Sequence, residues 1–346
     1  MFRKQILIGL VLVAGFLFFA SSAQAASIFD WTGGGDTTTW TDPRNWGTTC
    51  AGCYPGATST DEVRLHTNHS GNPIRATSTP PAAIDLLVIG YSQGEGPTLI
   101  IGNGAIITAT STSLQGTSTL KLGDSTWGSG ALRLTQGDET QNSGYPFNSN
   151  SWSTITFDAA TGTIKYATEP NGATPKTFNV PNLSFYNLVF DPADSPSGAA
   201  SENFAFSNSS TTVLNLLSAY DSQISGATLH LAGPIAGTST APIYLSGFSS
   251  INKGSVNADF TGSVNTDMIQ FQNFTNTATG ADSVGFASVT VSGSHTVNAV
   301  SHANLFAGNT QGELYTGGIT VNAGATLNLG GVAVDVLNTS PTVNGT

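Results

Sequence analysis

Charged side chains are scarce in this sequence of 346 residues. Only 9% of the chain is Asp, Glu, Lys or Arg, and 21 acidic residues outnumber ten basic ones. Soluble domains usually contain about 25% charged residues, so Ser, Thr, Asn and Gly must cover much of the exposed surface here. The formal net charge of −11 argues against nucleic acid or an anionic membrane surface as a partner, because both attract basic proteins.

The sequence also lacks an apolar run long enough to span a membrane as a helix. The longest uncharged apolar run, residues 6–20, is shorter than the ~20 residues that a span needs. It follows Arg3 and Lys4 and precedes Ala23-Gln24-Ala25, an order typical of a secretory signal peptide over residues 1–25. We therefore expect an exported protein, secreted or held at the cell surface, without a membrane span after cleavage.

Helical periodicity is nearly absent. Short apolar pairs alternate with polar residues instead, which is the pattern of strands with one buried face. Gly and Asn, which tolerate the positive φ of sharp turns, separate most of the pairs. Such pairs are Leu99 and Ile101, Leu120 and Leu122, Leu132 and Leu134, Ile164 and Tyr166, Val289 and Val291, and Ile319 and Val321.

The pattern continues for more than two hundred residues and repeats itself loosely. Strands at this spacing occur in sandwiches, barrels and solenoids. The absence of a helix-sized interruption and the weak internal repeat favour an all-β solenoid over a sandwich or a barrel. We expect an N-terminal segment over 26–80 and the solenoid body over 81–346, with a possible boundary near 191–203.

Three of the five tryptophans lie within sixteen residues: Trp31, Trp40 and Trp46. The first coil of a solenoid exposes an apolar face unless something covers it, and these indoles are well placed to do so. Asp42 and Pro43 predict a one-turn helix that directs Trp46 to the core. At the other end, residues 341–346 are similar to the start of another coil, so we expect a fragment or a partner covering that end.

Three segments resemble bacterial surface β-strand-repeat proteins, which are autotransporter-adhesin-like β-helix proteins. The first is Trp31-x-Gly33 followed by Trp40-Thr41-Asp42-x-x-Asn45-Trp46. The second runs from Gly162 to Tyr166 and continues through Val180-Pro181 to Tyr186-Asn187-Leu188-Val189-Phe190. The third is residues 318–329. The resemblance implies a right-handed parallel β-helix on the cell surface, usually without catalytic activity.

Cys50 and Cys53 are the only cysteines. Export favours a local disulfide between them. Two histidines, His66 and His69, follow at a spacing similar to a zinc site, although the His-x2-His gap is shorter than usual. Zinc bound by these four residues, or free thiols, therefore remain alternatives to the disulfide.

Groups suited to catalysis are few. Asp191 and Asp194 could in principle form a glycosidase or calcium pair, but a solvated turn explains them more simply. The basic residues of the mature chain are scattered, so no cluster for charge stabilisation is visible. We predict no catalytic residues, no enzyme activity and no cofactor.

Carbohydrate binding is a further possibility, because exposed aromatic rings can stack on sugars. Trp127, Trp152 and Tyr145 are the candidates, although we favour the interpretation that they fill corners between coils, because large aromatic side chains usually end up mostly buried. We expect a structural or adhesive surface protein whose partners are host or matrix glycans or other cell-surface proteins. The alternative is a carbohydrate-binding or polysaccharide-degrading β-helix protein.

Overall fold

The computed structural model describes residues 27–47, 52–56, 61–68, 71–91, 95–136, 144–149, 156–168 and 176–191. Beyond them it describes 202–206, 211–220, 222–225, 228–231, 243–246, 250–251, 257–260, 264–267, 288–300, 313–316, 318–329, 333–336 and 342–345. The expected signal peptide, residues 1–25, lies outside these ranges.

The protein is all-β, and its strands pair mainly in parallel. Helical structure within the described ranges consists of short 3-10 turns, of which η1 (Pro43–Asn45) is the one described in full. A 16-stranded main sheet runs through the whole molecule. Its strands in spatial order are β2 (Trp46–Gly47), β1 (Ile28–Trp31), β3 (Asp61–Leu65), β5 (Ile84–Ile89), β7 (Ile106–Leu114), β11 (Ala131–Leu134), β14 (Thr163–Tyr166), β16 (Ser184–Phe190), β18 (Thr211–Tyr220), β20 (Thr228–Leu231), β23 (Asn257–Phe260), β25 (Ser288–Val291), β28 (Ile319–Val321) and β31 (Thr342–Val343), with β12 (Phe147–Ser149) beside β7 and β21 (Ile243–Ser246) beside β18.

The strands that lie between these in the sequence form smaller sheets. Four are parallel: β4 (Ile74–Ala76), β6 (Thr98–Ile101), β8 (Thr119–Lys121) and β13 (Thr156–Asp158); then β15 (Thr177–Val180), β17 (Glu202–Phe206), β19 (Ser222–Ser225) and β22 (Ser250–Ile251); then β24 (Val264–Asp267), β26 (Thr296–Val300) and β29 (Thr326–Asn328); and last β27 (Glu313–Thr316) with β30 (Ala333–Val336). An antiparallel hairpin joins β9 (Gly123–Asp124) to β10 (Gly128–Ser129).

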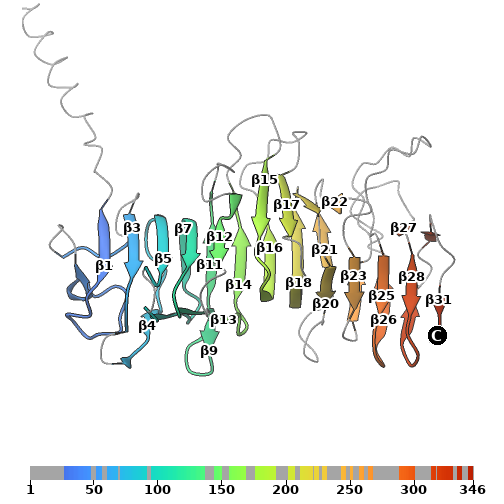
Figure 1. Ribbon diagram of the computed structural model, residues 1–346, viewed down its shortest axis with the longest axis horizontal. Coiled ribbons are helices and arrows are strands. Elements are labelled where there is room, and N and C mark those ends of the chain that lie inside the picture. Colours follow the sequence, from blue (N-terminus) through green and yellow to red (C-terminus); the bar gives the residue numbers. More distant parts are fainter. Residues whose placement is uncertain are drawn as a thin grey trace, which may run out of the picture.

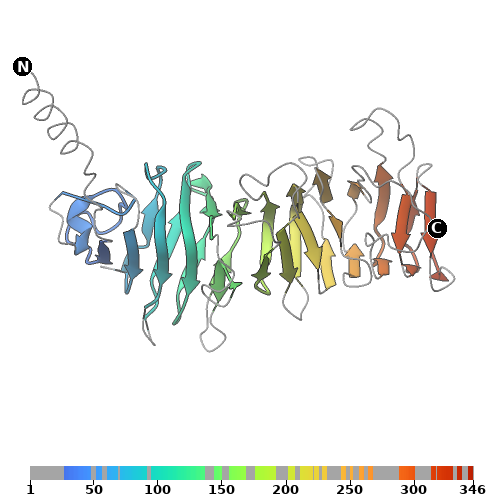
Figure 2. The same ribbon diagram turned by 90° about the horizontal axis from the view of Figure 1, so that it is seen from above.

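The chain alternates between the main sheet and a smaller one. It passes from β3 to β4, back to β5, on to β6 and back to β7, and each return adds a strand parallel to the previous one. Figure 1 shows the result as a row of strands in chain order along the long axis, and Figure 2 shows the same elongated stack from above.

Apolar side chains stack in register between neighbouring strands. One row joins Ile107, Leu132, Ile164, Leu188 and Leu217, all fully buried. Fully burying a Leu or Ile side chain stabilises the folded state by about 1.5–3 kcal/mol, so such rows are the main apolar contribution of each strand. The predicted pairs Leu99 with Ile101, Leu132 with Leu134, and Val289 with Val291 are buried, as the alternation indicated.

Gly and Asn occupy the sharp turns, as the sequence predicted. Asn103 and Gly104 join β6 to β7 with φ of 58° and 74°. Gly324 turns the chain between β28 and β29 with φ of 81°. Positive φ is costly for most L-residues, so the turn chemistry fixes where each strand ends.

The main sheet crosses both segment limits expected from the sequence. Its strands β1 and β3 lie within 26–80 and continue in register to β5. Strand β16 pairs with β18 across 191–203. The described part of the chain contains no helix long and apolar enough to cross a membrane.

Candidate functional site

The N-terminal segment buries three indoles around one another. Trp31 comes from β1, Trp46 from β2 and Trp40 from the loop between them, and they are 3%, 5% and 1% exposed. The rings of Trp31 and Trp40 meet Trp46 edge to face, with centroids 4.9 and 5.0 Å from it. Such aromatic pairs contribute about 0.5–1.5 kcal/mol beyond the area that they bury.

Backbone carbonyls satisfy two of the buried indole N–H groups. Trp40 Nε1 donates to the carbonyl of Pro55 at 3.2 Å, and Trp46 Nε1 donates to the carbonyl of Trp40 at 2.7 Å. Trp31 Nε1 has no hydrogen-bond partner among the described residues. The first two bonds fix the orientation of the rings as well as their burial.

The predicted one-turn helix is confirmed as η1. The Asp42 side chain accepts from the backbone N–H of Arg44, and Pro43 is the first residue of the turn. The Arg44 side chain returns to Asp42, with Nη2 2.8 Å from Oδ2, and this bond is the main cause that lowers the pKa of Asp42. Trp46 follows at the end of the turn and enters the core.

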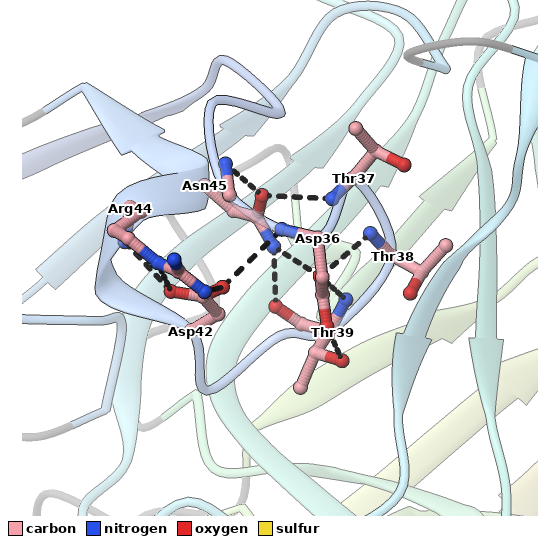
Figure 3. Close-up of polar contacts among 8 residues, drawn as sticks. Asp36, Thr37, Thr38, Thr39, Asp42, Arg44 and Asn45 are labelled. Carbon is pink, nitrogen blue, oxygen red and sulfur yellow. Dashed lines mark hydrogen bonds and ion pairs between the residues drawn. The ribbon is translucent and has the colours of Figure 1, made fainter.

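Asn45 holds the loop that precedes η1 (Figure 3). Its Oδ1 accepts from the backbone N–H of Gly35 at 2.8 Å and of Thr37 at 3.1 Å. Its Nδ2 donates to the carbonyl of Thr39 at 2.9 Å and to Asp36 Oδ1 at 2.8 Å. All four hydrogen bonds of this fully buried amide are therefore made.

Asp36 completes the loop from the other side. It accepts from the backbone N–H groups of Thr38 and Thr39 and from the Thr39 hydroxyl. Burial alone would raise the pKa of Asp36, but these bonds and the one from Asn45 outweigh it and lower the pKa well below its usual range. The network also holds Thr37 at a φ of 65°, which an unsupported threonine rarely adopts.

His66 lies between two carboxylates that the sequence did not connect with it. Its Nε2 is 3.1 Å from Asp30 Oδ1 on β1, and its Nδ1 is 3.0 Å from Glu95 Oε1 in the segment before β6. Burial alone would lower the pKa of His66, but the bonds to Asp30 and Glu95 outweigh it and raise the pKa. Both ring nitrogens are occupied by carboxylates, so neither is left to activate a nucleophile.

An aromatic and charged group adjoins His66 on the same face. The Tyr91 ring meets the imidazole edge to face at 5.4 Å, and the Arg64 guanidinium lies 4.5 Å from the centre of the Tyr91 ring. Arg64 Nε also donates to Glu62 Oε1 at 2.7 Å. These side chains tie together β1, β3 and β5 at the surface.

The zinc alternative finds little support in this geometry. Cys53 is disulfide-bonded and packs against the core, and the chain's one other cysteine, Cys50, lies outside the described residues. His69 lies outside them too, and His66 faces Asp30 and Glu95. No group of three or more His, Cys, Asp or Glu side chains able to hold a metal ion occurs in the described ranges.

Trp127 lies in the turn of the β9–β10 hairpin and is partly exposed, with 36% of its surface accessible. Asp124 Oδ1 accepts from the backbone N–H groups of Thr126 and Trp127 at 2.8 and 2.7 Å. The Arg75 guanidinium lies 5.7 Å from the centre of the Trp127 ring. The sequence singled out Trp127 but not Arg75, because 52 residues separate them.

The remaining candidates are not brought together. Tyr145 is half-buried, whereas Trp152 and Asp194 lie outside the described residues. Asp191 pairs with Lys165 through its Oδ2, so its described partner is a cation and not a second carboxylate.

No protein-family model, no curated protein and no solved structure matches the chain.

Proposed function

We propose that this chain is an exported, non-enzymatic right-handed β-solenoid that serves as a structural or adhesive protein at the cell surface. The observation that carries the proposal is the alternation of the chain between the main sheet and its smaller neighbours from β3 to β31, with parallel pairing within the main sheet over this range. Each turn then buries its apolar rows on the turns before and after it. Right-handedness is the rule for connections between parallel strands of one sheet.

The tryptophan layer supports an N-terminal cap. Trp31, Trp40 and Trp46 lie at the end of the main sheet where β1 has only the two-residue strand β2 beyond it. An end turn without large side chains would leave its inner apolar face in water. Asn45 then supplies hydrogen bonds to backbone groups of Gly35, Thr37 and Thr39 in the irregular loop beside the indoles.

The outward surface supports a structural role over catalysis. Uncharged side chains bond from strand to strand there: Asn187 Nδ2 donates to Thr163 Oγ1 at 3.2 Å, and Asn215 Nδ2 donates to Asn187 Oδ1 at 2.7 Å. Asn203 and Thr177 repeat the pattern on the adjacent small sheet. Such ladders give a regular polar face that suits adhesion to glycans or to other surface proteins.

The test uses intact cells of the source organism and a deletion of the gene. We expect an antibody to the folded chain to label intact cells, and we expect the deletion to reduce attachment to matrix or neighbouring cells. Retention of the protein inside the cell would contradict the proposed location. Turnover of a polysaccharide by the purified protein, abolished by substituting described acidic residues, would favour the degrading alternative.

A further inference from the structure

The surface beside Trp127 combines features that the structural role does not require. The outer face of the β4–β6–β8–β13 sheet presents a row in which Arg75, Ile100, Lys121 and Asp158 are register partners on successive strands. Neighbouring strands lie about 4.8 Å apart, so Arg75 and Lys121 flank Ile100 at a backbone separation of roughly 10 Å. This row lies on the side of the sheet opposite the buried Leu99 and Ile101.

The β9–β10 hairpin is fixed close to this row. The backbone N–H of Asn103 donates to the Trp127 carbonyl, and that of Gly104 donates to the Ser129 carbonyl at 2.8 Å. A Cβ on Gly102 would lie 2.9 Å from Trp127 Cβ, so only glycine permits this approach. The hairpin projects below the strands in Figure 1.

Ile100 is the apolar member of this row. It belongs to the outward set of β6, yet it is only 5% exposed. The Arg75 guanidinium under the Trp127 ring and the shielded Ile100 place the indole over the outer face of this sheet. Trp127 nevertheless keeps 36% of its surface accessible.

Arg75 differs from four other basic residues that the structure describes. Arg44, Arg64, Lys121 and Lys165 each have a carboxylate within 4.0 Å, whereas Arg75 has no ion-pair partner within the described ranges. Its Nε is shielded from solvent and has no hydrogen-bond partner there. Arg75 as a whole is nevertheless only half-buried, so a carboxylate can approach the accessible part of its side chain and form a charge-assisted hydrogen bond.

We propose that Trp127, Arg75 and Lys121 form a binding site for an acidic saccharide, a chain of uronic acid residues. The accessible part of the indole stacks on a sugar ring, Arg75 binds a carboxylate of the sugar, and Lys121, held loosely by Asp158 at 3.7 Å, binds a second carboxylate. The site deepens the proposed adhesive function by naming the chemical class of one partner. It is also testable in vitro, independently of where the protein is located.

The experiment measures binding of oligogalacturonate to the purified full chain by isothermal titration and by tryptophan fluorescence. The methyl-esterified oligomer is the matched neutral probe, because it keeps the sugar rings and loses the charges. We expect saturable binding of the acidic oligomer and at least about tenfold weaker binding of the ester. Rising salt weakens binding of the acid and leaves the ester unchanged.

Three substitutions test the separate roles of Trp127, Arg75 and Lys121 in binding the saccharide. We expect Trp127→Ala to weaken binding of both probes about tenfold or more. Arg75→Gln removes the preference for the acid, and Lys121→Gln reduces that preference by a smaller factor. The control is Arg133→Gln, which makes the same charge change on β11 of the main sheet and leaves binding unchanged.

Circular dichroism and thermal unfolding check that each variant is folded. Absence of saturable binding by the unsubstituted protein, equal affinity for acid and ester, or unchanged binding by folded Trp127→Ala would each overturn the site. Loss of binding in Arg133→Gln equal to that in Arg75→Gln would show a general charge effect and would overturn it too. None of these results affects the proposed location at the cell surface, which the labelling of intact cells tests separately.

Discussion

The N-terminal segment and the middle of the main sheet bury aromatic side chains in two different ways. In the first, three indoles meet edge to face, and two of their N–H groups bond to backbone carbonyls. In the middle, Phe190 and Phe204 stack with centroids 4.3 Å apart, and Tyr166 packs beside them at 5.4 and 5.7 Å. No hydrogen bond to the Tyr166 hydroxyl is found among the described residues.

The difference follows from the backbone around each cluster. In the middle, strand ladders satisfy the N–H and C=O groups, so apolar packing suffices. At the N-terminal end, the loop between β1 and β2 is irregular, and side chains must supply the missing bonds. The end of the sheet therefore depends on side-chain hydrogen bonds to the backbone, which the interior strands do not need.

Removing one indole of the N-terminal segment has the largest expected effect. Trp40→Ala should lower the free energy of unfolding by about 3–5 kcal/mol, because it leaves a cavity beside Trp46 and frees the Pro55 carbonyl. Urea unfolding followed by circular dichroism measures this loss. Trp127→Ala is the matched control, since the partly exposed ring should cost far less. Equal losses of unfolding free energy in both variants would contradict the idea that the buried indoles stabilise the fold more than the partly exposed one.

Removing the loop amide comes second. Asn45→Ala leaves two N–H groups, one carbonyl and Asp36 without the bonds that the amide provides. We expect a loss of about 2–4 kcal/mol and faster amide hydrogen exchange over residues 35–39. Thr38→Ala is the control, because no hydrogen bond of its hydroxyl is found among the described residues. Unchanged amide hydrogen exchange in Asn45→Ala would show that the loop keeps its conformation without the Asn45 side chain.

The middle cluster should respond in the opposite direction. Tyr166→Phe removes a buried hydroxyl that lacks a partner and keeps the ring, so the protein should gain up to about 1 kcal/mol of stability. Burial raises the pKa of Tyr166 far above its usual range, so its phenol should not ionise before the protein unfolds. Chemical unfolding and an ultraviolet pH titration measure the two effects. A clear loss of stability would reveal an acceptor for this hydroxyl.

The smallest expected effect is the pH dependence of the His66 contacts. The folded pKa of His66 is raised, so its stabilising effect is complete below the unfolded value of about 6.5 and is lost as the pH rises through the folded pKa. Comparison with His66→Gln should show a difference in unfolding free energy that is larger at pH 5 than at pH 9. It should stay below about 1 kcal/mol, because the ring is partly exposed to solvent. A difference independent of pH would show that the charge of His66 is not involved.

Local features of this fold were predictable from the sequence. The alternation of Leu132 and Leu134, the turn at Asn103 and Gly104, and the helical turn at Pro43 depend on neighbours a few residues away. Register was not predictable, because partners lie 24 residues apart between Val63 and Leu87 but 32 apart between Leu132 and Ile164. Corner loops of different length produce this irregular period.

The surface groups were missed for the same reason. His66 was visible only as a neighbour of Cys53, whereas its partners Asp30 and Glu95 lie 36 and 29 residues away. Arg75 and Trp127 meet only because β4, β6 and β8 are adjacent. Asn45 lies directly before Trp46, within a motif that the sequence already singled out. Its four hydrogen bonds were still not predictable, because they depend on the shape of the loop and not on sequence spacing.

Strand β2 has a consequence for how the protein behaves at high concentration. A parallel sheet that ended at β1 would offer an open row of amide and carbonyl groups to any extended peptide, and self-templated fibres grow from such rows. The reversed pair of Trp46 and Gly47 occupies the part of that row at Asp30 and Trp31 and is itself too short to template a further strand. We therefore expect β2 to hinder the end-to-end joining of crowded molecules at this side.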